Sequence, residues 1–277
     1  MKVFLKIILS LTAIQLSIAM APFKRAELLL PISRGGAFAI DPNSAAKIMG
    51  TLCLVQGTQS ALAPTLTFPH GGEKPSECNA KLVHRIGLLV LNVGISIYGL
   101  IFKGYDLKVS AAINSLLWIA DCLSSLLNNE SETLGPTKAG DISFLAFNAA
   151  VAYSALNNLP WFGTAFKANA LLTFLSSLSC MISPSFGIKF WGVKGDDDST
   201  AYMSLIGDHL FTRGVLMNSL AWGIDPLTAV GYGSATASIL HVRNGFFNSD
   251  VEKLGIDKRA YSFWAVSCAV VATSILV

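Results

Sequence analysis

An internal repeat constrains the fold of this chain more than any other feature of its sequence. The segment Pro64–Gly87 has a counterpart of the same length, Pro184–Gly207, which begins 120 residues later. A further match, Asp106-Leu107 with Asp225-Pro226-Leu227, follows after a slip of one residue. The sequence therefore predicts two similar units in tandem.

Both units, residues 41–160 and residues 161–277, are mostly apolar. Hydrophobic residues make up 52% of the chain and charged residues only 13%, and the mean hydropathy is +0.55. A soluble domain carries about 25% charged residues, so the composition indicates a membrane protein. Inside a bilayer the backbone must satisfy its hydrogen bonds within the segment, and helices are therefore the expected spanning elements.

Each unit contains four candidate spans, because a span needs about 20 largely apolar residues. The candidates cover residues 45–63, 82–102, 107–127 and 142–159 in the first unit and residues 168–182, 201–222, 226–242 and 261–277 in the second. Four spans return the chain to its starting side, so we expect parallel rather than inverted repeats. The predicted fold class is an all-α polytopic membrane protein with about eight transmembrane helices in two parallel four-helix repeats.

The number of spans, the placement of the loops and the proline that ends the first helix of each unit, Pro64 and Pro184, carry a resemblance to a known class. They resemble a duplication of the small four-helix membrane proteins of the DoxX-like type. That class has no single activity, so the resemblance implies an architecture and no reaction.

Residues 1–21 have the features of a secretory signal peptide. Lys2 and Lys6 precede an apolar stretch over residues 7–18, and small residues follow at the predicted cleavage site. An uncleaved signal anchor is the alternative. Residues 22–40 are basic and poor in acids, which is typical of a transit peptide or of a simple basic tail.

The junction Ser17-Ile18-Ala19-Met20-Ala21-Pro22 resembles the A-S-A-F-A-P motif that joins signal and transit peptides in algae with complex plastids. The match covers Ala19, Ala21 and Pro22, and Met20 stands where the motif has phenylalanine. The resemblance implies a plastid membrane as the destination. The alternative is an endomembrane protein on the ordinary secretory route.

Ionisable side chains inside a membrane span are costly and are candidates for function by default. Asp208, His209 and Arg213 lie within the expected span 201–222, and His241 lies in the next one. Asp121 lies deep in the first unit, at about the position that corresponds to His241. We expect these side chains to line a polar pocket inside the membrane.

The alternative interpretation is structural. Asp208 and Arg213 would then neutralise each other, while His84, Arg85 and Arg243 would reach to the membrane interface. The residues that correspond to Asp208, His209 and Arg213 in the first unit are Leu88, Leu89 and Val93, so the fold itself does not require charges there.

Other site chemistries find little support in the sequence. The run Asp196-Asp197-Asp198 lacks the spacing of a calcium loop and predicts a solvated loop, so no metal site is expected. Of the five cysteines, only Cys78 falls outside the expected spans, and no pair has metal-binding or redox spacing. Phe190-Trp191 suits an aromatic anchor at the interface. No basic block indicates nucleic-acid binding, and nothing identifies a cofactor.

Three functional hypotheses remain. The first is a non-catalytic scaffold, assembly or accessory factor, or binder of a small hydrophobic ligand, with the lipid bilayer and other membrane proteins as its partners. The second is a transporter or channel for a small solute. The third is a membrane enzyme that acts on a lipid or isoprenoid through Asp208 and His209, although no catalytic motif is present.

Overall fold

The fold is described from a computed structural model, in which residues 40–65, 76–127, 138–193, 196, 198–256 and 258–277 are defined. The predicted signal peptide and nearly all of the basic segment 22–40 lie outside these residues. Residues Asp41–Val277 form one compact unit, and the following description concerns that unit.

Helices make up the described part of the chain, which contains no strand. The first half, residues 41–160, consists of α2 (Pro42–Leu62), α3 (Glu77–Ile97) with the π-helical turn η2 (Tyr98–Phe102), α4 (Leu107–Leu127) and α6 (Ala139–Leu156). The second consists of α7 (Phe162–Ile182), α8 (Pro184–Trp191), α9 (Ser199–Ala221), α10 (Pro226–Phe246), α11 (Ser249–Glu252) and α12 (Lys258–Leu276). The predicted all-α class is therefore confirmed. The largest boundary differences are that α7 begins at Phe162 rather than at residue 168 and α3 begins at Glu77 rather than at residue 82.

Helix starts and stops follow local signals in the sequence. Asp41, Ser76 and Asp225 cap α2, α3 and α10, and each side chain accepts a hydrogen bond from the backbone N–H three residues later. α2 and α7 stop at Ala63-Pro64 and Ser183-Pro184, because the residue before a proline is disfavoured in the helical conformation.

Five helical segments are long and apolar enough to cross a membrane. They are Asn79–Phe102, Leu107–Leu127, Ala139–Leu156, Phe162–Ile182 and Lys258–Leu276. This length and composition indicate an integral membrane protein. The long helices α2, α9 and α10 are less apolar than these five, and their role is considered below.

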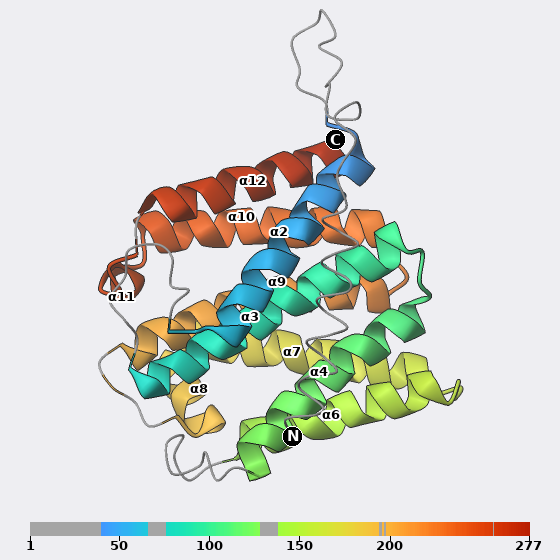
Figure 1. The fold of residues 1–277 in the computed structure, drawn as a ribbon, viewed down its shortest axis with the longest axis horizontal. Coiled ribbons are helices and arrows are strands. Elements are labelled where there is room, and N and C mark those ends of the chain that lie inside the picture. The colour runs from blue at the N-terminus through green and yellow to red at the C-terminus, as the bar shows by residue number, and fades with distance from the viewer. Residues whose placement is uncertain (1–39, 66–75, 128–137, 194–195, 197, 257) are drawn as a thin grey trace, which may run out of the picture. The chain divides into compact units, whose positions relative to one another are not determined.

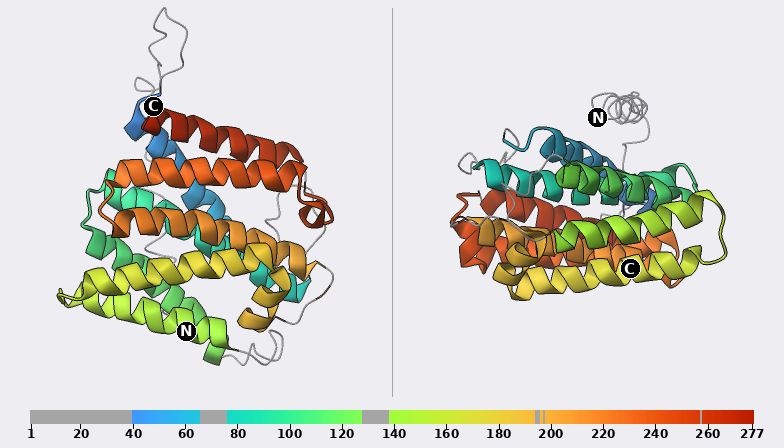
Figure 2. Two further views of the ribbon diagram at one scale, coloured as in Figure 1. Left: turned by 180° about the vertical axis from the view of Figure 1, so that it is seen from behind. Right: turned by 90° about the horizontal axis from the view of Figure 1, so that it is seen from below.

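The long helices pack in antiparallel pairs. α2 lies against α3, α4 against α6, α7 against α9 and α10 against α12, while α3 crosses α9 near the centre (Figure 1). Figure 2 shows α2, α3 and α4 lying across α10, α9 and α7. Successive long helices run in opposite directions, so the connections 103–106, 157–161 and 222–225 lie at one end and α8 and α11 at the other (Figure 1).

Glycines allow the closest helix contacts, as their enrichment in membrane helices predicts. A Cβ atom at Gly94 would come within 2.7 Å of the backbone nitrogen of Leu54, and one at Gly87 would overlap the backbone of Ala61. α3 therefore lies directly on the backbone of α2.

Candidate functional site

A cavity in the described unit lies between its two halves. It is bounded by α2 and α3 of the first half and by α9, α10 and α12 of the second. Its volume is about 80 Å³ when measured at the centres of water-sized spheres. One water needs about 10–15 Å³ on this measure, so the cavity has room for several waters or for part of a small organic molecule.

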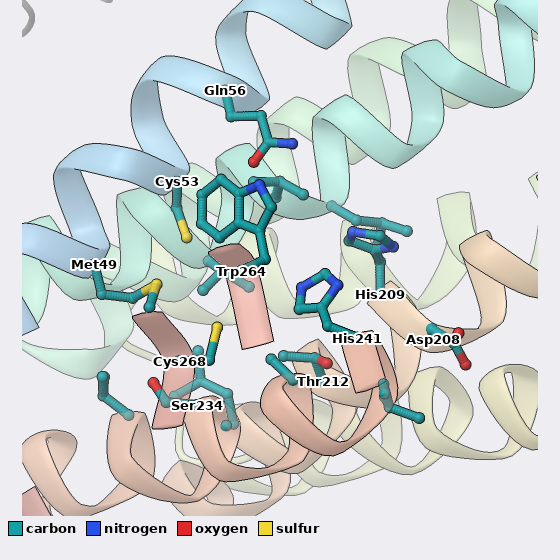
Figure 3. A pocket seen from close by; sticks show the side chains of 18 of the residues that line it. Met49, Cys53, Gln56, Asp208, His209, Thr212, Ser234, His241, Trp264 and Cys268 are labelled. Carbon is teal, nitrogen blue, oxygen red and sulfur yellow. The ribbon is translucent and has the colours of Figure 1, made fainter. Parts of the chain in front are cut away.

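Two histidines form the polar end of the cavity. His209 on α9 and His241 on α10 face each other with ring centroids 6.2 Å apart, and the ring of Trp264 lies 6.2 Å from that of His241 (Figure 3). Nδ1 of His209 lies 2.8 Å from the carbonyl oxygen of Leu205. Because a carbonyl only accepts, Nδ1 carries the hydrogen, and Nε2 of the neutral ring is left as an acceptor.

The opposite end of the cavity is mostly apolar and contains sulfur atoms. Met49 and Cys53 on α2 face Cys268 on α12, and Ser234 on α10 lies beside them (Figure 3). Both cysteines are free and buried. Valine, leucine, isoleucine and alanine side chains complete most of the remaining wall. The cavity thus combines a hydrogen-bonding end with an apolar end.

Asp208 has a different partner from the one that the sequence suggested. Its carboxylate accepts a hydrogen bond of 2.9 Å from Nη1 of Arg243 and one of 2.6 Å from Nδ2 of Asn244. The expected pairing of Asp208 with Arg213 is therefore wrong. Figure 3 shows the carboxylate pointing away from the two histidines, so Asp208 braces α9 against α10 from the edge of the cavity.

Arg213 lies outside this cavity, although the sequence placed it in the same polar pocket. One turn beyond His209, its guanidinium lies over the ring of Trp118 at 5.3 Å from the centroid. It borders a smaller neighbouring cavity instead. Of the five predicted pocket residues, the structure brings together Asp208, His209 and His241.

Asp121 belongs to a separate polar cluster in the first half. His84 Nε2 lies 3.2 Å and Arg85 Nε 3.5 Å from its carboxylate. Arg85 also donates through Nη2 to Asp141 at 2.6 Å, and the Ser125 hydroxyl donates to the same carboxylate at 2.8 Å. The expectation that Arg85 reaches the interface is wrong, because Arg85 is buried between two carboxylates.

Sequence reasoning missed Asp141, which opens a span in its first helical turn. The position of Asp141 could have revealed it. Asp141 is an acidic residue at the same end of the unit as Arg85, and one antiparallel helix lies between the two in the chain. Charge balance across neighbouring helices could have paired the two residues.

An aromatic cluster lies beside that network. Phe144 contacts Trp118 at 5.6 Å and Trp191 at 4.8 Å between ring centroids. The guanidinium of Arg85 lies 5.1 Å from the Trp191 ring. Trp191 is only 4% exposed, so its predicted role as an interfacial anchor is wrong. α8 folds back and inserts this ring into the core.

Asp196, in the acidic loop before α9, accepts hydrogen bonds at the starts of α3 and α9. The Asp196 carboxylate accepts hydrogen bonds from the Ser76 hydroxyl at 2.8 Å, from Asn79 at 3.0 Å and from the Ser199 hydroxyl at 2.8 Å. Partial burial raises the pKa of Asp196, but these hydrogen bonds outweigh it and hold the pKa below its usual range.

No cluster of three or more histidine, cysteine or acidic side chains suited to a metal ion occurs in the described residues. Cys53, Cys122, Cys180 and Cys268 are free and buried. Cys78, predicted in a loop, lies in α3; the prediction began that helix at residue 82, whereas the Ser76 cap starts it earlier.

Comparisons with protein-family models, with curated proteins and with solved structures gave no match to this chain.

Proposed function

We propose that the chain is an eight-helix membrane protein made of two parallel four-helix repeats, α2–α6 and α7–α12. Two pairs of glycines support the repeat. Gly87 and Gly207 meet the backbones of Ala61 and Met181, and Gly94 and Gly214 meet those of Leu54 and Phe174, so all four pairs of equivalent residues are separated by 120 positions.

The pairing of helices supports the same relation. The pair α2–α3 corresponds to the pair α7–α9, and the pair α4–α6 corresponds to the pair α10–α12. The contact between α6 and α7 corresponds to the contact between α12 and α2. α3 and α9, which correspond to each other, pack together. At their ends the equivalent residues Ser76 and Asp196 are hydrogen-bonded, as are Asn79 and Ser199. Direct contact between equivalent residues is expected close to a twofold axis.

The less apolar helices also fit a bilayer. α2 exposes Ile48, Val55 and Leu62, and α10 exposes Ile239 and Phe246, which suits contact with lipid. α9 is mostly buried by other helices, and a helix that is shielded from lipid can carry polar residues.

We propose that the cavity between the repeats binds a small, largely apolar molecule that carries a hydrogen-bond donor such as a hydroxyl. The supporting observation is the lining itself, which joins an apolar wall to His209 Nε2 as an oriented acceptor. Concave, mostly apolar sites with few polar groups are typical of small-molecule binding.

The role that fits this site is non-catalytic, as a ligand-binding scaffold or accessory factor for other membrane proteins. Within the described residues, no carboxylate orients the ring of His209, and Asp208 is held by Arg243 and Asn244. This arrangement lacks the acid–base pair that the enzyme hypothesis requires. The N-terminal segment supports the secretory route, with a plastid membrane as the proposed destination.

The test is the identity of molecules that copurify with the protein. We expect mass spectrometry of organic extracts to find a hydroxylated apolar molecule with the wild type. The same molecule should be depleted at least about tenfold in His209→Leu, because losing one buried hydrogen bond costs about 1–3 kcal/mol. His84→Leu, the same change outside the cavity, should retain it. Equal amounts with His209→Leu and the wild type would contradict the proposal.

A further inference from the structure

Arg213 on α9 is a buried cation without a counter-charge. Its side chain is 3% exposed, and among the described residues no carboxylate lies within ion-pair distance of its guanidinium. Nη1 has no hydrogen-bond partner. The contact with the Trp118 ring offsets only part of the cost of removing an arginine from water.

The other buried charges among the described residues are paired. Arg85 lies between Asp121 and Asp141, and Asp208 is bound by Arg243. The position that corresponds to Arg213 in the first repeat is Val93, so the fold does not require a cation there. An uncompensated charge at a position that the fold leaves free points to a ligand of opposite charge.

Arg213 borders a cavity of its own between α3, α4, α7 and α9. The polar part of its lining consists of Ser96, Ser110, Asn114 and Ser115, and the remainder is apolar. The volume is about 20 Å³ at the centres of water-sized spheres. Since one water needs about 10–15 Å³, the space suits a group with two oxygen atoms.

We propose that Arg213 binds a carboxylate in this cavity. The planar guanidinium matches the two oxygens of a carboxylate, whereas a phosphate carries four oxygens and is larger than the space. A water molecule would satisfy Nη1 but would leave the charge uncompensated. The hydroxyls of Ser110 and Ser115 supply further donors, and the apolar lining fits the start of an acyl chain. The carboxylate belongs either to such a chain or to a small free acid.

This site is independent of the cavity at His209. The two share Val93 and Leu216 as a common wall, but their polar groups differ, and the proposal holds whether or not the larger cavity binds a ligand.

The experiment measures the thermal unfolding midpoint of the purified full chain in detergent with sodium acetate, oleate, methyl oleate or inorganic phosphate. We expect acetate or oleate, at about 100 times its dissociation constant, to raise the midpoint by roughly 5–10 °C. Methyl oleate lacks the charge and phosphate exceeds the space, so neither should do so. A shift with acetate identifies a free acid as sufficient, and a shift with oleate alone identifies an acyl-chain acid.

Two variants and one control make the test specific. Arg213→Val introduces the residue of the first repeat and should abolish the shift, while Arg213→Lys should keep a reduced one because lysine lacks the planar fork. Lys167→Val is the control: Lys167 also lies over a tryptophan ring, Trp222, but is exposed and outside the cavity. It should respond like the wild type. No shift in the wild type, or an equal shift in Arg213→Val or, if that variant does not fold, in Arg213→Lys, would overturn the proposal.

Discussion

The two proposed repeats differ most in what fills the space beside the central pair of helices α3 and α9. In the first repeat the side chains of Trp118 and Phe144 fill it, joined by Trp191 from α8. When the helix caps Asp106 and Asp225 are aligned, Trp118 corresponds to Ala237, which lines the open cavity of the second repeat. A large ring on one side and a methyl group on the other thus distinguish a filled core from an open cavity.

The polar groups follow the same division. The filled side has a buried network in which Arg85 serves two carboxylates, and the open side has one pair, Asp208 with Arg243, in which the arginine is 36% exposed on its side chain. Under the proposed duplication, one copy carries more of the stability while the other leaves room for the proposed ligand. Substitutions made separately on the filled side and on the open side test this division.

The largest effect is expected from Arg85→Leu, which introduces the residue found at the corresponding position Leu205. It leaves Asp121 and Asp141 without their shared cation, and unpairing a buried ion pair costs about 3–5 kcal/mol. Arg243→Leu should cost less, because Asn244 still donates to Asp208. Chemical unfolding in detergent measures both, and a larger loss in Arg243→Leu would contradict the assignment of stability to the first repeat.

Trp118→Ala should destabilise the protein by about 3–4 kcal/mol, because it leaves a void among buried rings. Trp264→Ala is the matched change on the open side. Trp264 is half-buried and borders an existing cavity, so its loss should cost about 1–2 kcal/mol. Unfolding midpoints of the two variants give the comparison. Equal costs would show that the two sides are packed to the same degree.

Gly87→Ala and Gly207→Ala should each cost about 1–3 kcal/mol, because the new methyl group meets the backbone of the preceding helix in both repeats. Gly163→Ala is the control, since nothing lies within 4 Å of a Cβ atom there, and it should be neutral or slightly stabilising. The thermal unfolding midpoints of the three variants test this prediction. Tolerance of both core substitutions would argue against the repeat as a pair of equivalent helix contacts.

The smallest effect concerns Asp196, which connects equivalent ends of α3 and α9. Its pKa is lower in the folded than in the unfolded protein, so its contribution is present above about pH 4 and is lost as pH falls through the lowered value. The carboxylate is exposed, so the contribution should be less than about 1 kcal/mol. Asp196→Asn should reduce the fall of the thermal unfolding midpoint between pH 6 and pH 3. An unchanged pH profile would show that Asp196 does not contribute to stability.

The architecture was largely predictable, because apolar segment length and the prolines after α2 and α7 act locally. The helical segments expected at residues 107–127 and 226–242 appear as α4 and α10. Composition is less decisive for α2, α9 and α10, which are not among the five described helices that are long and apolar enough to cross a membrane.

The site was predictable only in part. Asp208, His209 and His241 were found because ionisable residues are rare in apolar segments. Their partners were not, since neither the pairing of Asp208 with Arg243 nor that of Arg85 with Asp141 follows from spacing along one helix. Burial of Trp191 depends on how α8 folds back, which sequence periodicity does not report.

The most direct test of the account is the ligand content of Ala237→Trp, measured by mass spectrometry of extracts from the purified protein. This change gives the second repeat the residue that fills the first, so the account predicts a folded protein that has lost the molecule found with the wild type. A folded Ala237→Trp protein that retains that molecule at the wild-type ratio would contradict the assignment of the cavity as its binding site.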